Sequence, residues 1–110
     1  MDFENNYSVV YSFKVKNGKE NEFIENWKFG TRLIYEYEGS LGSRLHKIES
    51  NMFMAYALWP DKKTFDEATN KIPSELENKR IANFKNCVDE FKVIFKSEVV
   101  SDLINSEVNI

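Results

Sequence analysis

The chain has 110 residues, a formal net charge of −3 and a single cysteine. This length predicts one domain, residues 1–110, built around one hydrophobic core. The negative net charge provides no basic surface for phosphates, so nucleic-acid binding is not expected. The longest apolar run, residues 52–59, is too short to cross a bilayer, so no membrane partner is expected either.

The use of cysteine and the polar start of the chain bear on its location. Cys87 is the single thiol and cannot form an internal disulfide. The start, MDFENNYS, contains no apolar secretion segment. Both features are typical of a reduced, cytoplasmic protein, and we expect that location.

The first third of the chain predicts a strand followed by a helix. In residues 7–15, YSVVYSFKV, apolar residues alternate with more polar ones, which predicts a strand with one strongly apolar face. The apolar residues of 19–38 recur at steps of three and four, which predicts an amphipathic helix. Gly30 lies in the apolar stripe of this helix and costs about 1 kcal/mol relative to alanine. We expect it to mark a close approach to the sheet.

The middle of the chain predicts two strands joined by a turn. Gly39 ends the helix, residues 40–48 form the second strand, and residues 49–51 turn the chain into a third strand over 52–59. The third strand is apolar on both faces, with Met52, Met54, Tyr56 and Leu58 alternating with Phe53, Ala55, Ala57 and Trp59.

The last third predicts helical segments and a final strand. Pro60 ends the third strand, and Asp61 caps a short helix within 61–70. Residues 73–88 predict a second helical segment, in which Ser74 and Glu77 have the spacing of a capping box. Residues 90–100 predict the fourth strand, with Phe91, Val93 and Phe95 on one face and Lys92 and Lys96 on the other.

The order of these elements indicates the fold class. Strand, helix, strand, strand, helix, strand is the α+β, ferredoxin-like βαββαβ arrangement, with a four-stranded antiparallel sheet. Its helices cover one face of the sheet, so the third strand would expose an apolar row on the other face. The expected cover is the same sheet of a second copy, which predicts a homodimer.

Three stretches of the chain carry a family resemblance: FKVKNGKENEFIENW, GSLGSRLHK and YALWPDKKTFDEA. Together they resemble the antibiotic biosynthesis monooxygenase (ABM) domain family, over residues 7 to about 70. The resemblance implies a ferredoxin-like domain that dimerises sheet to sheet into a dimeric α+β barrel. Members include cofactor-independent quinone-forming monooxygenases, haem-degrading enzymes and aldehyde-processing decarboxylases, so the resemblance implies a fold and a pocket more than an oxidation.

The resemblance separates the activities residue by residue. Haem-degrading members share Trp59 but have an iron-ligating histidine ten residues later, where this chain has Thr69. They also have an asparagine in the first strand, where this chain has Tyr11. The quinone-forming members share Trp59, but their asparagine and tyrosine are replaced by Ala55 and Phe65. Haem degradation is therefore not expected. Trp59 itself has a simpler interpretation, because a tryptophan beside the start of a helix is typical of an ordinary core residue.

His46 is the one weak catalytic candidate, because a neutral imidazole can act as a general base. No further ligands converge on it, so no metal is expected. A three-residue turn over 49–51 would pair His46 with Met54, on the face away from the helices. A turn made of residues 50–51 alone would pair it with Ala55 and reverse its direction.

The first register is favoured because it places two leucines, Leu41 and Leu45, in the helix-side core. Trp59 and His46 would then lie on opposite faces of the sheet. The dimer face on this interpretation contains Ser8, Ser12, Arg44, His46, Met54 and Tyr56.

The helix-side face predicts a ligand pocket in which aromatic rings surround the small residues Ala55 and Ala57. The predicted lining is Tyr11, Phe13, Trp27, Phe53 and Trp59. Small residues beneath large rings leave either a cavity or a tightly packed core. No Gly-rich phosphate loop is present, so no cofactor is expected.

The leading hypothesis is a homodimeric ABM-like protein that binds a small aromatic or apolar molecule. The resemblance implies that it could also oxidise this molecule without a cofactor. The alternative is a non-catalytic homodimeric binding or structural module of the same fold.

Overall fold

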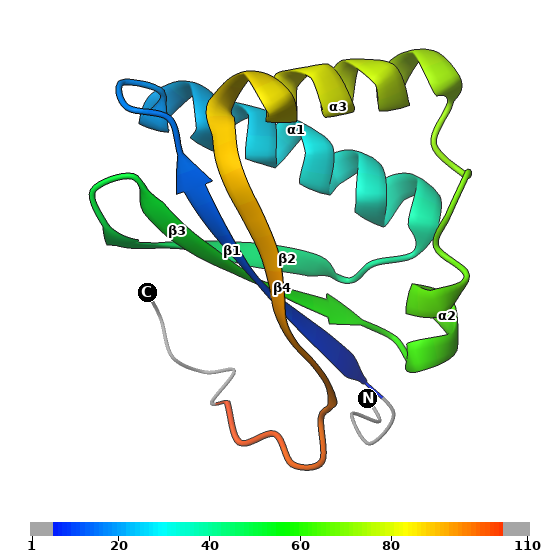
Figure 1. Ribbon diagram of the computed structural model, residues 1–110. Helices are drawn as coiled ribbons and strands as arrows, with labels where there is room; N and C mark the ends of the chain where they lie inside the picture. Colours follow the sequence, from blue (N-terminus) through cyan, green and yellow to red (C-terminus); the bar gives the residue numbers. More distant parts are fainter. Residues whose placement is uncertain (1–5, 105–110) are drawn as a thin grey trace.

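A four-stranded antiparallel sheet with helices on one of its faces forms the body of the protein (Figure 1). The computed structural model describes residues 6–104, so the two ends of the predicted domain lie outside the described part. Its elements are β1 (Tyr7–Val15), α1 (Glu20–Glu38), β2 (Gly42–Glu49), β3 (Met52–Trp59), α2 (Lys62–Asp66), α3 (Ser74–Cys87) and β4 (Val88–Glu98). The strand order β2-β3-β1-β4 confirms the ferredoxin-like α+β class.

The pairing of the central strands β1 and β3 decides which side chains face the helices. Tyr7 pairs with Trp59, and Phe13 pairs with Phe53. Because side chains alternate along a strand, the odd-numbered residues of both strands point toward the helices. The Phe13 ring lies in the middle of this core, with its centroid 5.2 Å from that of Phe23 and 5.4 Å from that of Phe91.

The β2–β3 connection combines features of the two predicted registers. Residues 50–51 alone form the turn, and Asn51 adopts a φ of 63°, a left-handed conformation that asparagine tolerates. A bulge at Ile48 then shifts the pairing by one residue, so His46 pairs with Met54. The predicted pairing of His46 is confirmed, whereas the predicted three-residue turn is wrong because the bulge supplies the extra residue.

The two leucines that supported this register behave differently. Leu45 packs against the helix-side core as predicted. Leu41 is 53% exposed, so its predicted place in the core is wrong. It precedes β2, and its backbone N–H donates to the carbonyl of Leu58 at 2.8 Å.

The edge strand β4 departs from the predicted alternation. A bulge opposite β1 accommodates Ile94 as an extra residue. Phe91 and Val93 share the helix-facing side, but Phe95 points to the other face and is 65% exposed. Lys96 lies on the helix side, with its ammonium 5.3 Å from the centroid of the Phe65 ring. The prediction for Phe95 and Lys96 is wrong because the bulge reverses the faces of the residues beyond it.

Gly30 marks a close approach, but of a different element than predicted. A Cβ atom on Gly30 would lie 3.2 Å from Cγ and 3.3 Å from Cδ of Arg80. The neighbour is therefore helix α3 rather than the sheet, and the prediction is wrong in this respect. Figure 1 shows α1 and α3 side by side above the sheet.

The two predicted helix caps have different outcomes. Asp61 caps α2 as predicted, with Oδ1 accepting from the N–H of Thr64 at 2.7 Å. The capping box in α3 is wrong, because Ser74 is already the first helical residue and its side chain makes no cap. The Glu77 carboxylate instead accepts from Nε of Arg80 at 2.7 Å.

Within residues 6–104, no helix has the length and apolar character needed to cross a membrane.

The sheet face opposite the helices combines apolar and polar residues. Tyr56 is 38% exposed there, and the neighbouring residues of β3 on this face are partly exposed. The strand register places all six residues of the predicted dimer face on it, namely Ser8, Ser12, Arg44, His46, Met54 and Tyr56. Ser8 and Ser97 hydrogen-bond through their hydroxyl groups at 3.1 Å.

Candidate ligand pocket

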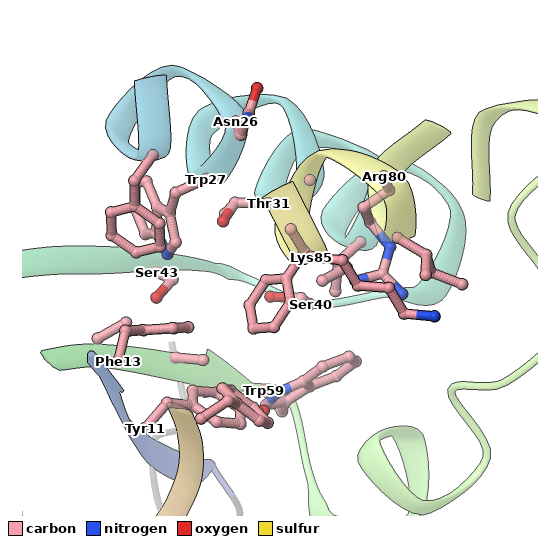
Figure 2. Close-up of a pocket in the computed structure, with 18 residues that line it drawn as sticks. Tyr11, Phe13, Asn26, Trp27, Thr31, Ser40, Ser43, Trp59, Arg80 and Lys85 are labelled. Carbon is pink, nitrogen blue, oxygen red and sulfur yellow. The ribbon is translucent and has the colours of Figure 1, made fainter. Parts of the chain in front are cut away.

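A cavity of about 420 Å³ lies between the helix-facing side of the sheet and helices α1 and α3 (Figure 2). Small residues leave this space open, with Ala55 and Ala57 in its floor and Gly30 in its roof. The volume is in the range of small-molecule sites in proteins, about 300–1,000 Å³. The arrangement can therefore hold a small organic ligand.

The structure brings together four of the five residues predicted to line a pocket: Tyr11, Phe13, Trp27 and Trp59. Phe53 is not part of the lining. Its buried ring packs against the ring of Phe23, with centroids 5.1 Å apart, and fills the core instead. Further apolar lining comes from residues that the sequence reasoning did not select, which are Phe23, Ile34, Ile81, Phe84 and Phe91.

Trp59 is the most informative residue of the pocket. It is 4% exposed, and its ring contacts the Phe65 ring edge-on at a centroid distance of 5.4 Å. Within the described part of the chain, its indole Nε1–H is buried and has no hydrogen-bond partner. A buried donor without a partner costs about 1–3 kcal/mol. Trp59 therefore combines a ring that lines the cavity with a buried indole donor that has no partner among the described residues.

Tyr11 provides a second polar group among the aromatic rings. Its ring is stacked on that of Phe91, with centroids 5.4 Å apart and planes inclined by 22°. Burial raises the pKa of the Tyr11 phenol, because the charged phenolate would lose its hydration. The phenol therefore remains protonated at neutral pH and can donate a hydrogen bond.

The serines and asparagine of the lining already have partners within the protein. Ser43 donates to the carbonyl of Tyr56 at 2.8 Å. The Ser40 hydroxyl accepts from the N–H of Gly42 at 2.9 Å. Asn26 donates to the Cys87 thiol at 3.3 Å and so joins α1 to α3. These groups shape the walls and leave Trp59 as the orphaned donor.

Helix α3 contributes two cationic side chains, Arg80 and Lys85 (Figure 2). Arg80 forms an ion pair with Glu77. Among the described residues, no carboxylate lies within ion-pair distance of Lys85. The sequence reasoning missed both residues, because the weak apolar periodicity of α3 does not indicate which of its sides faces the sheet.

Acids and imidazoles are missing from the described lining of this cavity. His46, the weak catalytic candidate, pairs with Met54 and lies on the opposite face of the sheet from Trp59. The two residues therefore do not belong to one reaction centre within a chain.

Cys87 is buried beside the pocket, and burial raises the pKa of its thiol, so the unreactive protonated form is favoured.

Comparisons with known proteins identify the fold. No sequence-family model matches the chain, and curated protein sequences give no significant match. The structure is similar to a point mutant of SnoaB, a cofactor-independent oxygenase from Streptomyces nogalater, with a TM-score of 0.71 and 14% identity over 92% of this chain and 99% of that one. It is also similar to NE2512 from Nitrosomonas europaea, a protein of unknown function, with a TM-score of 0.71 and 12% identity over 96% and 99% of the two chains.

A third similar structure is a candidate antibiotic biosynthesis monooxygenase from Bordetella bronchiseptica. Its TM-score is 0.69, with 16% identity over 88% of this chain and 99% of that one. The chain thus has the fold of the ABM proteins. At such low identity the likeness concerns the fold and not the chemistry.

Proposed function

We propose that the protein binds a flat, largely apolar molecule in the cavity between the sheet and helices α1 and α3. The observation that carries this proposal is the orphaned indole N–H of Trp59, a residue whose ring lines an aromatic cavity. A ligand oxygen placed at this N–H would relieve its unmet hydrogen bond. The ligand is therefore a flat molecule that carries a carbonyl or a similar acceptor.

The shape and composition of the cavity support a planar ligand. Rings from both layers surround the space, with Tyr11 and Trp59 on the sheet side and Trp27 on α1 (Figure 2). Aromatic rings favour stacked or edge-on contacts with other rings. A volume of about 420 Å³ has room for roughly two or three fused rings.

A matched pair of ligands tests this proposal. 9-Fluorenone and fluorene have the same flat ring system, but only fluorenone carries a carbonyl. Each is titrated against the protein loaded with the fluorescent dye N-phenyl-1-naphthylamine. We expect saturable displacement of the dye and an affinity about fivefold higher for fluorenone, the size of one net hydrogen bond.

The variant Trp59→Phe keeps a ring but removes the donor, so the preference for fluorenone should disappear. Trp27→Phe, which removes the other indole of the lining, is the matched control and should keep the preference. The proposal fails if no dye binds saturably, or if Trp59→Phe retains the full preference.

Cofactor-independent oxidation of the ligand is a second candidate function. The similarity to SnoaB, a cofactor-independent oxygenase of the same fold, favours this candidate. The described lining contains no acid or imidazole to take up a proton, so binding remains the primary proposal. In such an oxidation an activated methylene group and dioxygen would give a carbonyl group and water.

Oxygen uptake tests this second candidate. Anthrone is oxidised in this way to anthraquinone, and an oxygen electrode follows the consumption of dioxygen. Uptake that depends on the protein and is lost when Ala57→Leu fills the cavity would support the oxygenase. Oxygen uptake no faster than in buffer alone would exclude oxidation of anthrone and support the non-catalytic binding module.

We also propose that a second copy of the chain covers the open face of the sheet. Tyr56 and Phe95 are exposed on this face, and Met54 and Leu58 are partly exposed beside them. An apolar sheet face of this kind is rarely left in water, and a two-fold axis would bury it against itself. His46 would then lie in the subunit interface.

A further inference from the structure

The Arg80 side chain packs closely over Gly30. Arg80 starts on α3 and lines the cavity, and its stem passes directly over the backbone of α1 at Gly30. A Cβ atom at Gly30 would approach the Arg80 stem to 3.2 Å, closer than most contacts between carbon atoms. An alanine at position 30 would therefore require the Arg80 stem to shift by a few tenths of an ångström.

Glu77 fixes the guanidinium from the other side. Its carboxylate accepts from Nε of Arg80 at 2.7 Å and forms an ion pair with Nη2. Glu77 does not line the cavity, and its carboxylate engages Nε and Nη2 of the guanidinium but not Nη1. Glu38 also stays out of the lining, although its charge interacts with those of Glu77 and Arg80.

The charges that face the cavity are therefore positive. Arg80 and Lys85 both extend from α3 toward the sheet on the same side of the cavity (Figure 2). Among the described residues, the lining contains these two cations and no carboxylate. Hydrogen bonds between a guanidinium or ammonium and an anion are about twice as strong as neutral ones.

We propose that Gly30 and Glu77 position Arg80 so that, together with Lys85, it binds an acidic group on the flat ligand. This inference rests on the proposed function and narrows its substrate class to acidic aromatic molecules, such as ring sulfonates, carboxylates or ionised phenols. Gly30 and Glu77 are positioning residues, whereas Arg80 and Lys85 contact the ligand. The role also accounts for a glycine in the middle of α1, where alanine would form a better helix.

Two dyes of nearly the same shape test the inference. 8-Anilinonaphthalene-1-sulfonate carries a sulfonate, and N-phenyl-1-naphthylamine is its neutral counterpart. Both are titrated at fixed ionic strength, since salt screens the attraction. We expect the wild-type protein to bind the sulfonate dye about tenfold more tightly than the neutral one.

Gly30→Ala should weaken this tenfold preference while its melting temperature stays equal to or above that of the wild type. Arg80→Gln should remove the preference without touching α1. Lys79→Gln removes the same charge from the neighbouring position on α3, outside the cavity lining, and should leave the preference unchanged. Ala57→Leu should weaken both dyes, because it fills the cavity itself.

The outcomes separate this inference from the function it rests on. If neither dye binds, or if Ala57→Leu has no effect on either, the pocket does not take ligands and the proposed function fails. If the neutral dye binds but the sulfonate dye binds no more tightly, the inference alone is overturned. The positioning role of Gly30 is overturned if Gly30→Ala keeps the full preference, or weakens both dyes equally together with a lower melting temperature.

Discussion

The orphaned donor of Trp59 makes a quantitative prediction about stability. Trp59→Ala deletes a buried indole ring and should lower the free energy of unfolding by about 3–5 kcal/mol, the usual cost of such a truncation. Trp59→Phe also loses part of the ring, but it removes the buried N–H that has no partner. Removing this unsatisfied donor should recover about 1–3 kcal/mol of the free energy of unfolding. We therefore expect Trp59→Phe to lie within about 1 kcal/mol of the wild type.

Urea unfolding measures this difference. Circular dichroism and tryptophan fluorescence, which comes from Trp27 alone in the variants, follow the transition, and the slope against urea should be unchanged if only the native state is affected. For a chain of this size about 1 kcal/mol corresponds to roughly 4 °C, so Trp59→Ala should lower the melting temperature by about 12–20 °C. All variants are compared at one protein concentration, because association would shift the midpoint.

The comparison can refute the reasoning. If Trp59→Phe destabilises the protein as much as Trp59→Ala, the indole N–H contributes a hydrogen bond in the folded protein. The claim that Trp59 carries an unused donor would then be wrong. A ligand that stabilises the wild type more than Trp59→Phe would independently support the donor's role.

Three further predictions concern other parts of the molecule. The wild type should sediment at roughly twice its 13.0 kDa chain mass, and a wild-type monomer would contradict the proposed dimer. Tyr56→Lys places a charge on the open sheet face and should weaken self-association at least about tenfold. Glu20 accepts from Lys47 at 2.7 Å and from the N–H of Asn51 at 2.6 Å, which holds the pKa of its carboxyl below the usual value. The stabilising contribution of Glu20 is present above the unfolded-state pKa and is lost as pH falls through the folded-state pKa. Glu20→Gln should therefore lower the melting temperature at neutral pH and progressively less in acid, and an equal loss at both pH values would argue against this linkage. Because Thr69 stands where haem-degrading relatives have their histidine, a haem titration should give no sharp Soret band of a ligated complex, and a tight stoichiometric spectrum would reverse this expectation.

The sequence predicted the order and type of the main elements, because alternation and helical periodicity are local properties. Strands β1 and β3 have the predicted limits, and α1 differs by one residue at its start. The pairing of His46 with Met54 was also predictable, although the turn that produces it was not. A bulge and a longer turn give the same register, and sequence patterns do not distinguish them.

Two of the errors, at β4 and at Gly30, share a cause, which is packing between elements far apart in the chain. The bulge at Ile94 depends on how β4 pairs with β1, and it decides the faces of Phe95 and Lys96. The residue that Gly30 accommodates is Arg80, fifty positions away on another helix. A small residue in a helix predicts a close neighbour, but the identity of this neighbour depends on the tertiary fold.

The same division holds for the pocket. The sequence alone determined its aromatic floor, because Tyr11, Phe13 and Trp59 belong to strands whose apolar faces are evident from their alternation. Only the tertiary structure decided its charged groups. The orientation of α3 brings Arg80 and Lys85 to the cavity, and that orientation depends on contacts with α1 that α3's own weakly amphipathic sequence does not encode.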